Sequence, residues 1–261
     1  MMKGRSRILI TVAAAGIVLT AGCASIALSY KHNSDALWKI VSQKCLPNQN
    51  QNHDPTPCRK VDLRNGFVVL KDRNGPLQYL LMPAGKITGI ESPILLNPST
   101  PNFFAEAWCS RHYMEEKRGA PIEESALALS INSQRGRTQN QLHIHISCLR
   151  PDIRQRLDSL SGILTGLWQS EQLGGHVYQV RAVTRDEIKK MSPFIRIANE
   201  LPGAREEMYK YGIAIAALPD GRRALMVIKR NLLLMNKGSA EELQDHTCDI
   251  LSTSRATDAA L

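Results

Sequence analysis

The sequence is poor in aromatic residues and short of acidic ones. Phe, Trp and Tyr make up 5% of the chain, and 24 Asp and Glu stand against 33 Lys and Arg, which gives a formal net charge of +9. Such a surplus favours anionic partners, namely phosphates, anionic lipid head groups or nucleic acid. No basic stripe is interleaved with stacking side chains, so we expect no nucleic-acid partner.

The chain also lacks an internal repeat at the level of residues, although strands and helices are expected in both halves. With 261 residues, of which 43% are hydrophobic, it can bury a full core without relying on disulfides. We predict a membrane anchor over residues 1–31 and a tail over 252–261. Between them lies a folded domain at 32–251, with a core at 65–150 and an extension or second half at 151–251.

Charged residues are absent from one long stretch near the N-terminus. Lys3, Arg5 and Arg7 precede an uncharged, mostly apolar run over residues 8–28. This run is about 21 residues long, which is enough to cross a bilayer as a helix and longer than the apolar part of a cleaved signal peptide. Because a basic flank stays in the cytoplasm, we predict a single transmembrane signal anchor followed by an exported domain.

A cleaved lipoprotein is the alternative interpretation of the same stretch. The sequence Leu19-Thr20-Ala21-Gly22-Cys23 resembles a bacterial lipobox, whose Cys is lipidated after cleavage, although Thr20 stands where an aliphatic residue is usual. In either case the exported domain would be tethered to a membrane surface.

Five cysteines follow the apolar run, and an oxidising compartment would allow them to pair. Cys45 and Cys58 bracket a short polar loop, which favours a local bridge between them. We predict a second bridge between Cys148 and Cys248, which leaves Cys109 free. Other pairings of the five remain open at this point.

The pattern of apolar residues predicts a mixture of strands and helices. Two strand-like segments at 66–71 and 77–82 flank an Asn-Gly pair, which is a strong hairpin signal. Together with a strand at 125–132, they indicate an α+β fold with an antiparallel sheet. The other predicted elements are a short helix at 34–42, a polar loop at 46–57, helices at 102–117 and 152–167, a strand at 176–181, a helix opened by Thr184, strands at 213–218 and 224–228, and a last helix near Ser239.

One segment, Gln141-Leu142-His143-Ile144-His145-Ile146-Ser147-Cys148, alternates polar and apolar residues without a break. As a strand it would place Gln141, His143, His145 and Ser147 on one face and four apolar residues on the other. The apolar face suits a core. Two imidazoles and two hydrogen-bonding groups in a row suit phosphate chemistry or a metal.

This segment resembles the signature of the histidine-triad superfamily, whose members hydrolyse or transfer nucleotides through a His nucleophile. Gly136-Arg137-Thr138 sets the register, so that His143 occupies the nucleophile position and His145 the third position. Gln141 replaces the first His, and Ser147 is polar where the family has an apolar residue. The resemblance implies an antiparallel, histidine-triad-like sheet with helices, here preceded by one transmembrane helix.

The resemblance also implies which residues bind phosphate. Asn132 matches the Asn that contacts phosphate ahead of the family's His hairpin. We therefore predict His143 and His145 as catalytic residues, and the following as phosphate ligands: Asn132, Thr138, Gln141, Ser147 and Arg137.

The chain as a whole resembles the bacterial CDP-diacylglycerol pyrophosphatase family. The resemblance rests on the N-terminal anchor, residues 71–83, residues 98–104, residues 132–151 and Gln244-Asp245-His246. It implies hydrolysis of CDP-diacylglycerol to CMP and phosphatidate in phospholipid metabolism, through a cytidylyl-His143 intermediate and without a metal or other cofactor. It also implies a bacterial inner-membrane protein with its catalytic domain on the periplasmic side.

Other interpretations of the His pair stay open. Two His at i and i+2 of a strand can share a zinc ion, with a third ligand from elsewhere. The candidates for that ligand are an acidic residue, His112, His176 or His246, and His246 is otherwise expected to be a surface or capping residue. A third possibility is a membrane-tethered nucleotide- or lipid-binding protein without catalysis. A register shifted by two residues would instead make His145 the nucleophile and Ser147 the third member.

Overall fold

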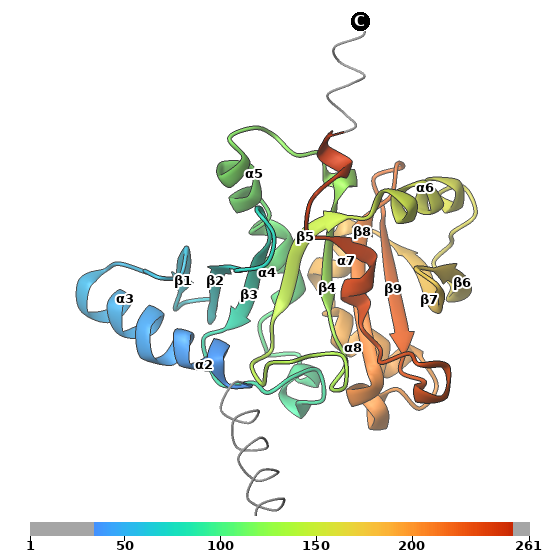
Figure 1. Cartoon of the computed structure of the whole chain (residues 1–261). Coiled ribbons are helices and arrows are strands. Elements are labelled where there is room, and N and C mark those ends of the chain that lie inside the picture. Colours follow the sequence, from blue (N-terminus) through green and yellow to red (C-terminus); the bar gives the residue numbers. More distant parts are fainter. Residues whose placement is uncertain (1–33, 253–261) are drawn as a thin grey trace, which may run out of the picture.

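The computed structural model describes residues 34–252, which form a mixed α/β structure around one ten-stranded sheet (Figure 1). Every strand pairing in this sheet is antiparallel. The predicted α+β class with an antiparallel sheet is therefore confirmed. The predicted anchor at 1–31 and almost all of the predicted tail lie outside the described residues. Within residues 34–252, no helix combines the length and the apolar character needed to cross a membrane.

The first half of the chain contributes five strands: β1 (Lys60–Asp62), β2 (Phe67–Lys71), β3 (Tyr79–Pro83), β4 (Leu127–Ile131) and β5 (Ile144–Leu149). Their spatial order is β1-β2-β3-β5-β4. The predicted hairpin is β2 and β3, paired from Lys71↔Tyr79 to Phe67↔Pro83. Gly75 in its turn has a φ of 66°, a conformation that glycine adopts at little cost.

The second half repeats this strand order with β6 (Gln169–Leu173), β7 (His176–Val183), β8 (Tyr211–Ala217) and β9 (Arg223–Lys229). It continues the sheet as β8-β9-β7-β6, and β4 pairs with β8 in the centre. In each half the first hairpin, β2–β3 or β6–β7, lies toward the edge of the sheet, and the second pair, β4–β5 or β8–β9, lies toward its centre. In this comparison β9 corresponds to β5. The second half thus echoes the first in topology, but β9 contains no His, and the His segment has no second copy there.

Four helices cover one face of the sheet: α4 (Phe103–Cys109), α5 (His112–Arg118), α7 (Arg185–Lys190) and α8 (Pro193–Glu200). They pack on alternate strand residues such as Leu81, Ile146 and Ile215 in the main core. The helix predicted at 102–117 is two helices, because a turn with i→i−3 hydrogen bonds at Ser110 and Arg111 interrupts the α-helical pattern. Thr184 opens α7 with the predicted capping box.

The opposite face carries helices at its two sides, and the C-terminal segment packs on β4 and β8 between them. On one side, α2 (Ala36–Ile40), a π-helical turn (Val41–Cys45) and α3 (Leu46–Asn52) form one continuous helix that packs on β2 and β3. The polar loop predicted at 46–57 is therefore wrong for its first half. There Leu46 packs on the core, while the last Asn and Gln residues of the helix face solvent.

On the other side of this face, α6 (Pro151–Leu160) packs on β7, β8 and β9. The helix predicted at 152–167 ends early, at Leu160. The helix expected near Ser239 is only a 3₁₀ turn (Ala240–Leu243), which is followed by the two-residue strand β10 (Gln244–Asp245). Between the two covered sides, the strip of sheet over β5 carries polar residues.

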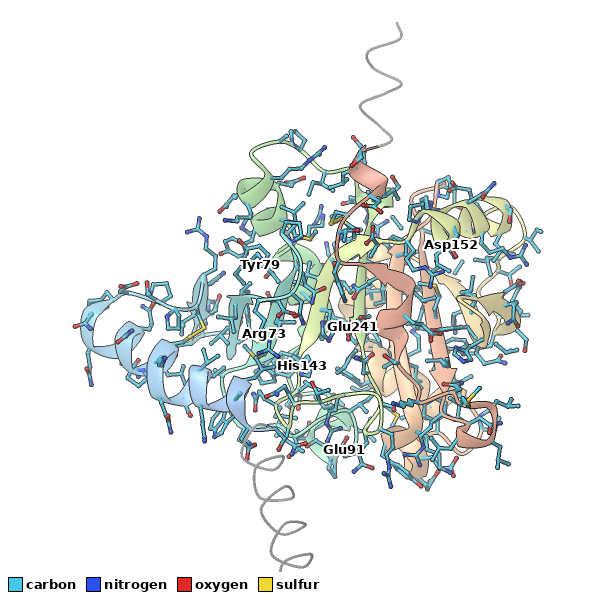
Figure 2. All side chains as sticks on the ribbon, viewed as in Figure 1. Arg73, Tyr79, Glu91, His143, Asp152 and Glu241 are labelled. Carbon is cyan, nitrogen blue, oxygen red and sulfur yellow. A yellow bond between two sulfur atoms is a disulfide. The ribbon has the colours of Figure 1, made fainter. Side chains whose placement is uncertain are left out.

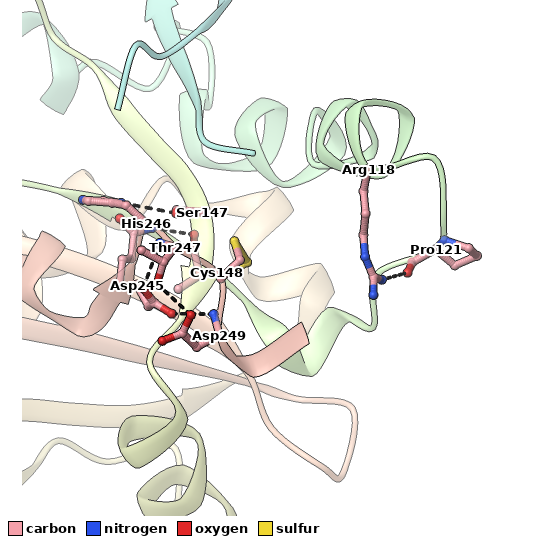
Figure 3. The surroundings of a disulfide bond; sticks show 11 residues. Arg118, Pro121, Ser147, Cys148, Asp245, His246, Thr247 and Asp249 are labelled. Carbon is pink, nitrogen blue, oxygen red and sulfur yellow. Dashed lines mark hydrogen bonds between the residues drawn. A yellow bond between two sulfur atoms is a disulfide. The ribbon is translucent and has the colours of Figure 1, made fainter. Parts of the chain in front are cut away.

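Both predicted disulfides are present, Cys45–Cys58 and Cys148–Cys248, and Cys109 is free and exposed. The second bond joins β5 to the C-terminal segment across 100 residues of sequence (Figure 3). Beside it, β10 pairs with β5 at Cys148 and Leu149, just beyond the residues that pair with β3. The C-terminal segment is thereby fixed next to the polar strip.

Candidate active site

The predicted His strand is β5, which begins later than expected. From Ile144 onward the alternation holds: Ile144 and Ile146 enter the main core, and His145 and Ser147 face the opposite side. His143 lies just before the strand in an irregular segment, and all five of these residues are buried or nearly so. The sequence pattern therefore predicted the two faces correctly and the start of the strand three residues too early.

His143 is held in a single orientation by its own lead-in segment. Its Nδ1 lies 2.6 Å from the backbone oxygen of Gln141. Because a carbonyl only accepts, Nδ1 carries the ring proton and Nε2 keeps its lone pair. Burial lowers the pKa of His143 to about 4, helped by the neighbouring His145, and this outweighs the opposing effect of the carbonyl. The imidazole is therefore neutral near pH 7, the form that a nucleophile requires.

His145 stacks edge-on against His143, with ring centroids 4.9 Å apart. Its Nδ1 is 3.3 Å from Nε2 of Gln78, an amide nitrogen identified by its bond to the Asp72 carboxylate. Nδ1 is equally close, at 3.3 Å, to Oε1 of Glu241, which only accepts, so a donor and an acceptor face the same ring nitrogen and the position of the ring proton depends on which of them His145 bonds. That Nε2 is buried and has no hydrogen-bond partner among residues 34–252. Nε2 is therefore the ring nitrogen of His145 that is available to a ligand.

Glu241, in the C-terminal 3₁₀ turn, adds a carboxylate to the same cluster. Its Oε1 lies 3.3 Å from Nδ1 of His145 and 3.0 Å from Nε2 of His246. Burial opposes its ionisation, but these imidazoles and the amide of Asn132 outweigh burial and lower the pKa of Glu241 to about 2. In return, hydrogen bonding to Glu241 raises the pKa of His246.

His246 lies against β5, because the Cys148–Cys248 bond holds the segment there. Its Nδ1 is 3.4 Å from the hydroxyl of Ser147, a residue with no exposed surface (Figure 3). Sequence reasoning favoured a surface or capping role for His246 and otherwise offered it as a third zinc ligand. The structure brings it into the His145–Glu241 cluster, through a contact between residues about a hundred positions apart. Ser147, predicted to bind phosphate, is in contact with His246 instead.

Two other predicted phosphate ligands hold the backbone or the cluster in place. Asn132 donates from Nδ2 to Glu241 at 2.8 Å, and its Oδ1 accepts from Ser239 and from the Glu241 backbone. Gln141 has no exposed surface, and its Nε2 donates to two backbone carbonyls of the loop after β3, at 2.9 and 3.0 Å. Both N–H groups of the Gln141 amide are thus occupied, and the Asn132 amide is bonded to Glu241, so both residues position the site in this structure.

Arg137 is also engaged elsewhere. Its guanidinium binds Glu91 through two nitrogens, at 2.7 and 2.6 Å, and its side chain is nearly buried. Such a bidentate pair neutralises the charge that we had assigned to phosphate binding. Of the predicted ligands, Thr138 remains exposed and next to His143 and His145 in the lining of one cavity.

That cavity has a volume of about 340 Å³ and supplies cations that sequence reasoning missed. Lys44 from the π-helical turn and Lys71 and Arg73 from the β2–β3 hairpin line it. Neither Lys44 nor Arg73 has an ion pair within residues 34–252. Figure 2 shows Arg73, His143 and Glu241 approaching from three separate segments. In the sequence, only the family resemblance at residues 71–83 and 244–246 indicated that these segments contribute to the site.

The geometry thus combines a neutral, oriented imidazole, a second imidazole with a free ring nitrogen and a group of cations, and the sequence comparisons point to the same chemistry. A model of the CDP-diacylglycerol pyrophosphatase family matches residues 32–252. Over 240 residues the chain is 51% identical to the CDP-diacylglycerol pyrophosphatase of Yersinia pestis, covering 90% of this chain and 91% of that protein. The chain belongs to the CDP-diacylglycerol pyrophosphatase family.

In this member of the CDP-diacylglycerol pyrophosphatase family, the zinc hypothesis finds no assembled ligand set. Among residues 34–252, no three His, Cys, Asp or Glu side chains gather in a way that could hold a metal ion. His112 and His176, two of the proposed third ligands, bind the carbonyl of Cys109 and the carboxylate of Glu242, respectively.

The low pKa of His143 leads to a prediction about pH. Since protonation removes the lone pair from Nε2, kcat/KM should fall on the acid side near pH 4 and not near 6.5, the ordinary His value. Activity profiles, with circular dichroism at each pH to confirm folding, would measure this. Titration of ¹³C-labelled histidine by NMR would identify the group, and an acid limb near 6.5 that follows the His143 resonance would contradict the assignment.

A second prediction concerns the contact between the β2–β3 hairpin and the C-terminal segment. A Cβ on Gly75 would lie 2.2 Å from the backbone oxygen of His246, so Gly75→Ala must push the hairpin tip away. We expect kcat/KM to fall about tenfold, because Arg73 and Asp72 move with the tip. Gly203→Ala is the control, since Gly203 has a similar φ of 68° and open space around it. Equal activity in the two variants would argue against the contact.

Proposed function

We propose that this protein hydrolyses CDP-diacylglycerol to CMP and phosphatidate through a covalent cytidylyl-His143 intermediate. Family membership supports the substrate and the reaction, and the name of the family describes a hydrolase of a diphosphate bond. The observation that carries the mechanism is the 2.6 Å bond from Nδ1 of His143 to the Gln141 carbonyl. It leaves the lone pair of Nε2 available in a cavity lined by Lys44, Lys71 and Arg73.

In the first step, Nε2 of His143 attacks the cytidine-side phosphorus. A P–N bond forms, the bond from this phosphorus to the bridging oxygen breaks, and phosphatidate leaves with the bonding electrons. Phosphatidate is a phosphate monoester and leaves readily, so the absent first His of the triad costs little. His145 donates from Nε2 to a phosphate oxygen, and the cations balance the charge that builds on the oxygens.

In the second step, water attacks the same phosphorus. The P–N bond breaks, CMP is released, and His143 regains its lone pair while keeping the proton on Nδ1. A proton from the water passes to solvent. Thr138, the predicted ligand that lines the cavity, binds a phosphate oxygen in both steps. Asn132 and Gln141 act by holding Glu241 and the loop after β3.

The assignment to the histidine-triad superfamily and the membrane location form part of the same proposal. The β3-β5-β4 arrangement, with His143 leading into β5, supports a histidine-triad-like fold for the first half. The apolar run at 8–28 supports an inner-membrane anchor. The two disulfides support a periplasmic position for the folded domain, because such bonds persist in oxidising compartments.

Hydrolysis by the purified full-length protein in oxygen-18 water tests the proposal. Attack at the cytidine-side phosphorus places the label in CMP, whereas label in phosphatidate would exclude the cytidylyl-His143 intermediate. An absence of turnover would favour a binding protein. A parallel reaction after exhaustive chelation should retain activity, and loss with rescue by zinc would favour the metal-dependent alternative.

A further inference from the structure

Four consecutive large apolar residues are exposed in the turn that follows β9. Leu232, Leu233, Leu234 and Met235 have 56%, 95%, 70% and 88% of their surface exposed. We call residues 232–235 the apolar tip. Single exposed apolar side chains are common on soluble proteins, but a contiguous set usually marks an interaction site.

The apolar tip is held away from the core by the Asn residues at its two ends. Asn231 and Asn236 exchange backbone hydrogen bonds, both 2.9 Å long, and the Asn231 side chain accepts from the backbone of Leu233. Asn236 is buried, and its side chain bonds to the backbone of Lys229 and Gly238. The exposure of the tip is therefore a property of a closed, hydrogen-bonded turn.

The surface beside the tip is basic. A cavity of about 660 Å³ lies against Leu232 and is also lined by Arg135, Arg137, Lys237 and Thr138. Arg137 is neutralised by Glu91, but Arg135 and Lys237 are exposed and have no ion pair within residues 34–252. Apolar side chains that project beyond a basic rim match the layers of an anionic bilayer, in which acyl chains lie beneath phosphates.

The position of the tip fits the same partner. Ser34, the first described residue, lines the basic cavity, and the apolar run at 8–28 precedes it in the sequence. Thr138 lines both this cavity and the one that contains His143 and His145. In Figure 1, the loop after β9 and the start of α2 lie toward the same lower edge of the molecule.

We propose that the apolar tip inserts into the head-group layer of an anionic phospholipid bilayer, with Arg135 and Lys237 binding lipid phosphates. This contact is separate from the N-terminal anchor and does not depend on the chemistry proposed for His143. It turns the cavity at Thr138 toward the membrane surface. A lipid-linked diphosphate could then reach the His pair while its acyl chains remain in the bilayer.

The test uses the full-length protein, which the N-terminal run can attach to the membrane. It therefore measures whether the apolar tip lies in the bilayer, and not whether the protein binds to the vesicle. In a background in which Cys23 and Cys109 are both replaced by Ser, Leu233→Cys is labelled with an environment-sensitive fluorophore. The protein is reconstituted into vesicles of phosphatidylethanolamine and phosphatidylglycerol that contain a spin-labelled quenching lipid. We expect at least about a twofold loss of emission at position 233 when the quencher is present.

Leu167→Cys is the matched control, since Leu167 is 76% exposed and lies at the opposite end of the sheet. The nearby Thr165 bonds Ala182, which pairs with Ala224 at the start of β9, whereas the tip follows the end of β9. Position 167 should not be quenched. Equal quenching at both positions, or none at 233, would overturn the proposal. The proposal would also be overturned if, in detergent micelles without lipid, position 233 were shielded from solvent by a second copy of the protein, as detected by cross-linking.

A functional comparison separates this proposal from that for the active site. Leu233→Ser with Met235→Ser should lower turnover of CDP-diacylglycerol in vesicles about tenfold and leave turnover of detergent-dispersed substrate unchanged. Equal losses in both forms would contradict a membrane role for the tip. If no form of the protein turns over this substrate, the function proposal fails, and the quenching result still decides the position of the tip.

Discussion

Replacing His143 by Ala is expected to reduce kcat for CDP-diacylglycerol at least about a thousandfold, because no other group can form the covalent intermediate. In free energy this is about 4 kcal/mol of lost transition-state stabilisation. Loss of the bond to the Gln141 carbonyl would cost about 1–3 kcal/mol of stability, which a melting curve would detect separately. Steady-state kinetics and thermal unfolding of the same preparation measure the two effects.

His112→Ala is the matched control for His143→Ala. His112 is half exposed on α5, and its Nδ1 contacts only the nearby Cys109 carbonyl. Its replacement should leave kcat unchanged. His145→Ala tests the alternative register: under our assignment it slows turnover but still allows trapped cytidylyl-enzyme, whereas His143→Ala gives none. Trapping in His143→Ala and not in His145→Ala would reverse the two roles.

Replacing Glu241 by Gln is expected to lower kcat about a hundredfold while preserving the side-chain shape. The Glu241 carboxylate contacts both His145 and His246 and is itself held by Asn132. Without its charge, the His145 imidazole is no longer held in the orientation in which it contacts the substrate. KM should change less than kcat, because the cations that bind the diphosphate come from other segments. Glu242→Gln is the control, since Glu242 pairs with His176 outside the cavity.

The same substitution changes how stability depends on pH. The His246 pKa is raised in the folded protein, so the folded state binds this proton more tightly than the unfolded state. The resulting stability is fully present below pH 6.5 and is lost as pH rises through the raised value. Thermal unfolding of Glu241→Gln should lack this loss above pH 6.5. A wild-type profile that is flat there would contradict the ion pair between Glu241 and His246.

The features that sequence predicted correctly are local ones. The alternation of polar and apolar residues predicted which side chains of β5 face the core. Asn74-Gly75 predicted the β2–β3 hairpin, and Thr184 predicted the start of α7. Each depends on residues that are near one another in the chain, where backbone geometry leaves few options. At 46–57 the prediction missed a helix because Leu46 packs on strands that are distant in sequence, and at 102–117 it missed the turn at Ser110 and Arg111.

The site residues divide in the same way. The His pair and Thr138 come from one short stretch, and the motif that contains them could be read directly from the sequence. Glu241 and His246 reach the site only through β10 and the Cys148–Cys248 bond, and Lys44 only through the helix that packs on β2 and β3. Asn132, Gln141 and Arg137 have the right chemistry for phosphate, but partners distant in sequence occupy them.

The sequence by itself therefore determined the family, the antiparallel sheet, the Cys45–Cys58 bond and the His pair, because these follow from local patterns or from resemblance along the chain. The Cys148–Cys248 bond was predicted correctly, but the sequence left other pairings open. Only the tertiary structure decided which polar groups are free. Hydrogen bonds and ion pairs form between segments up to about a hundred residues apart, and a donor already bonded to Glu91, Glu241 or a backbone carbonyl is no longer available to a substrate.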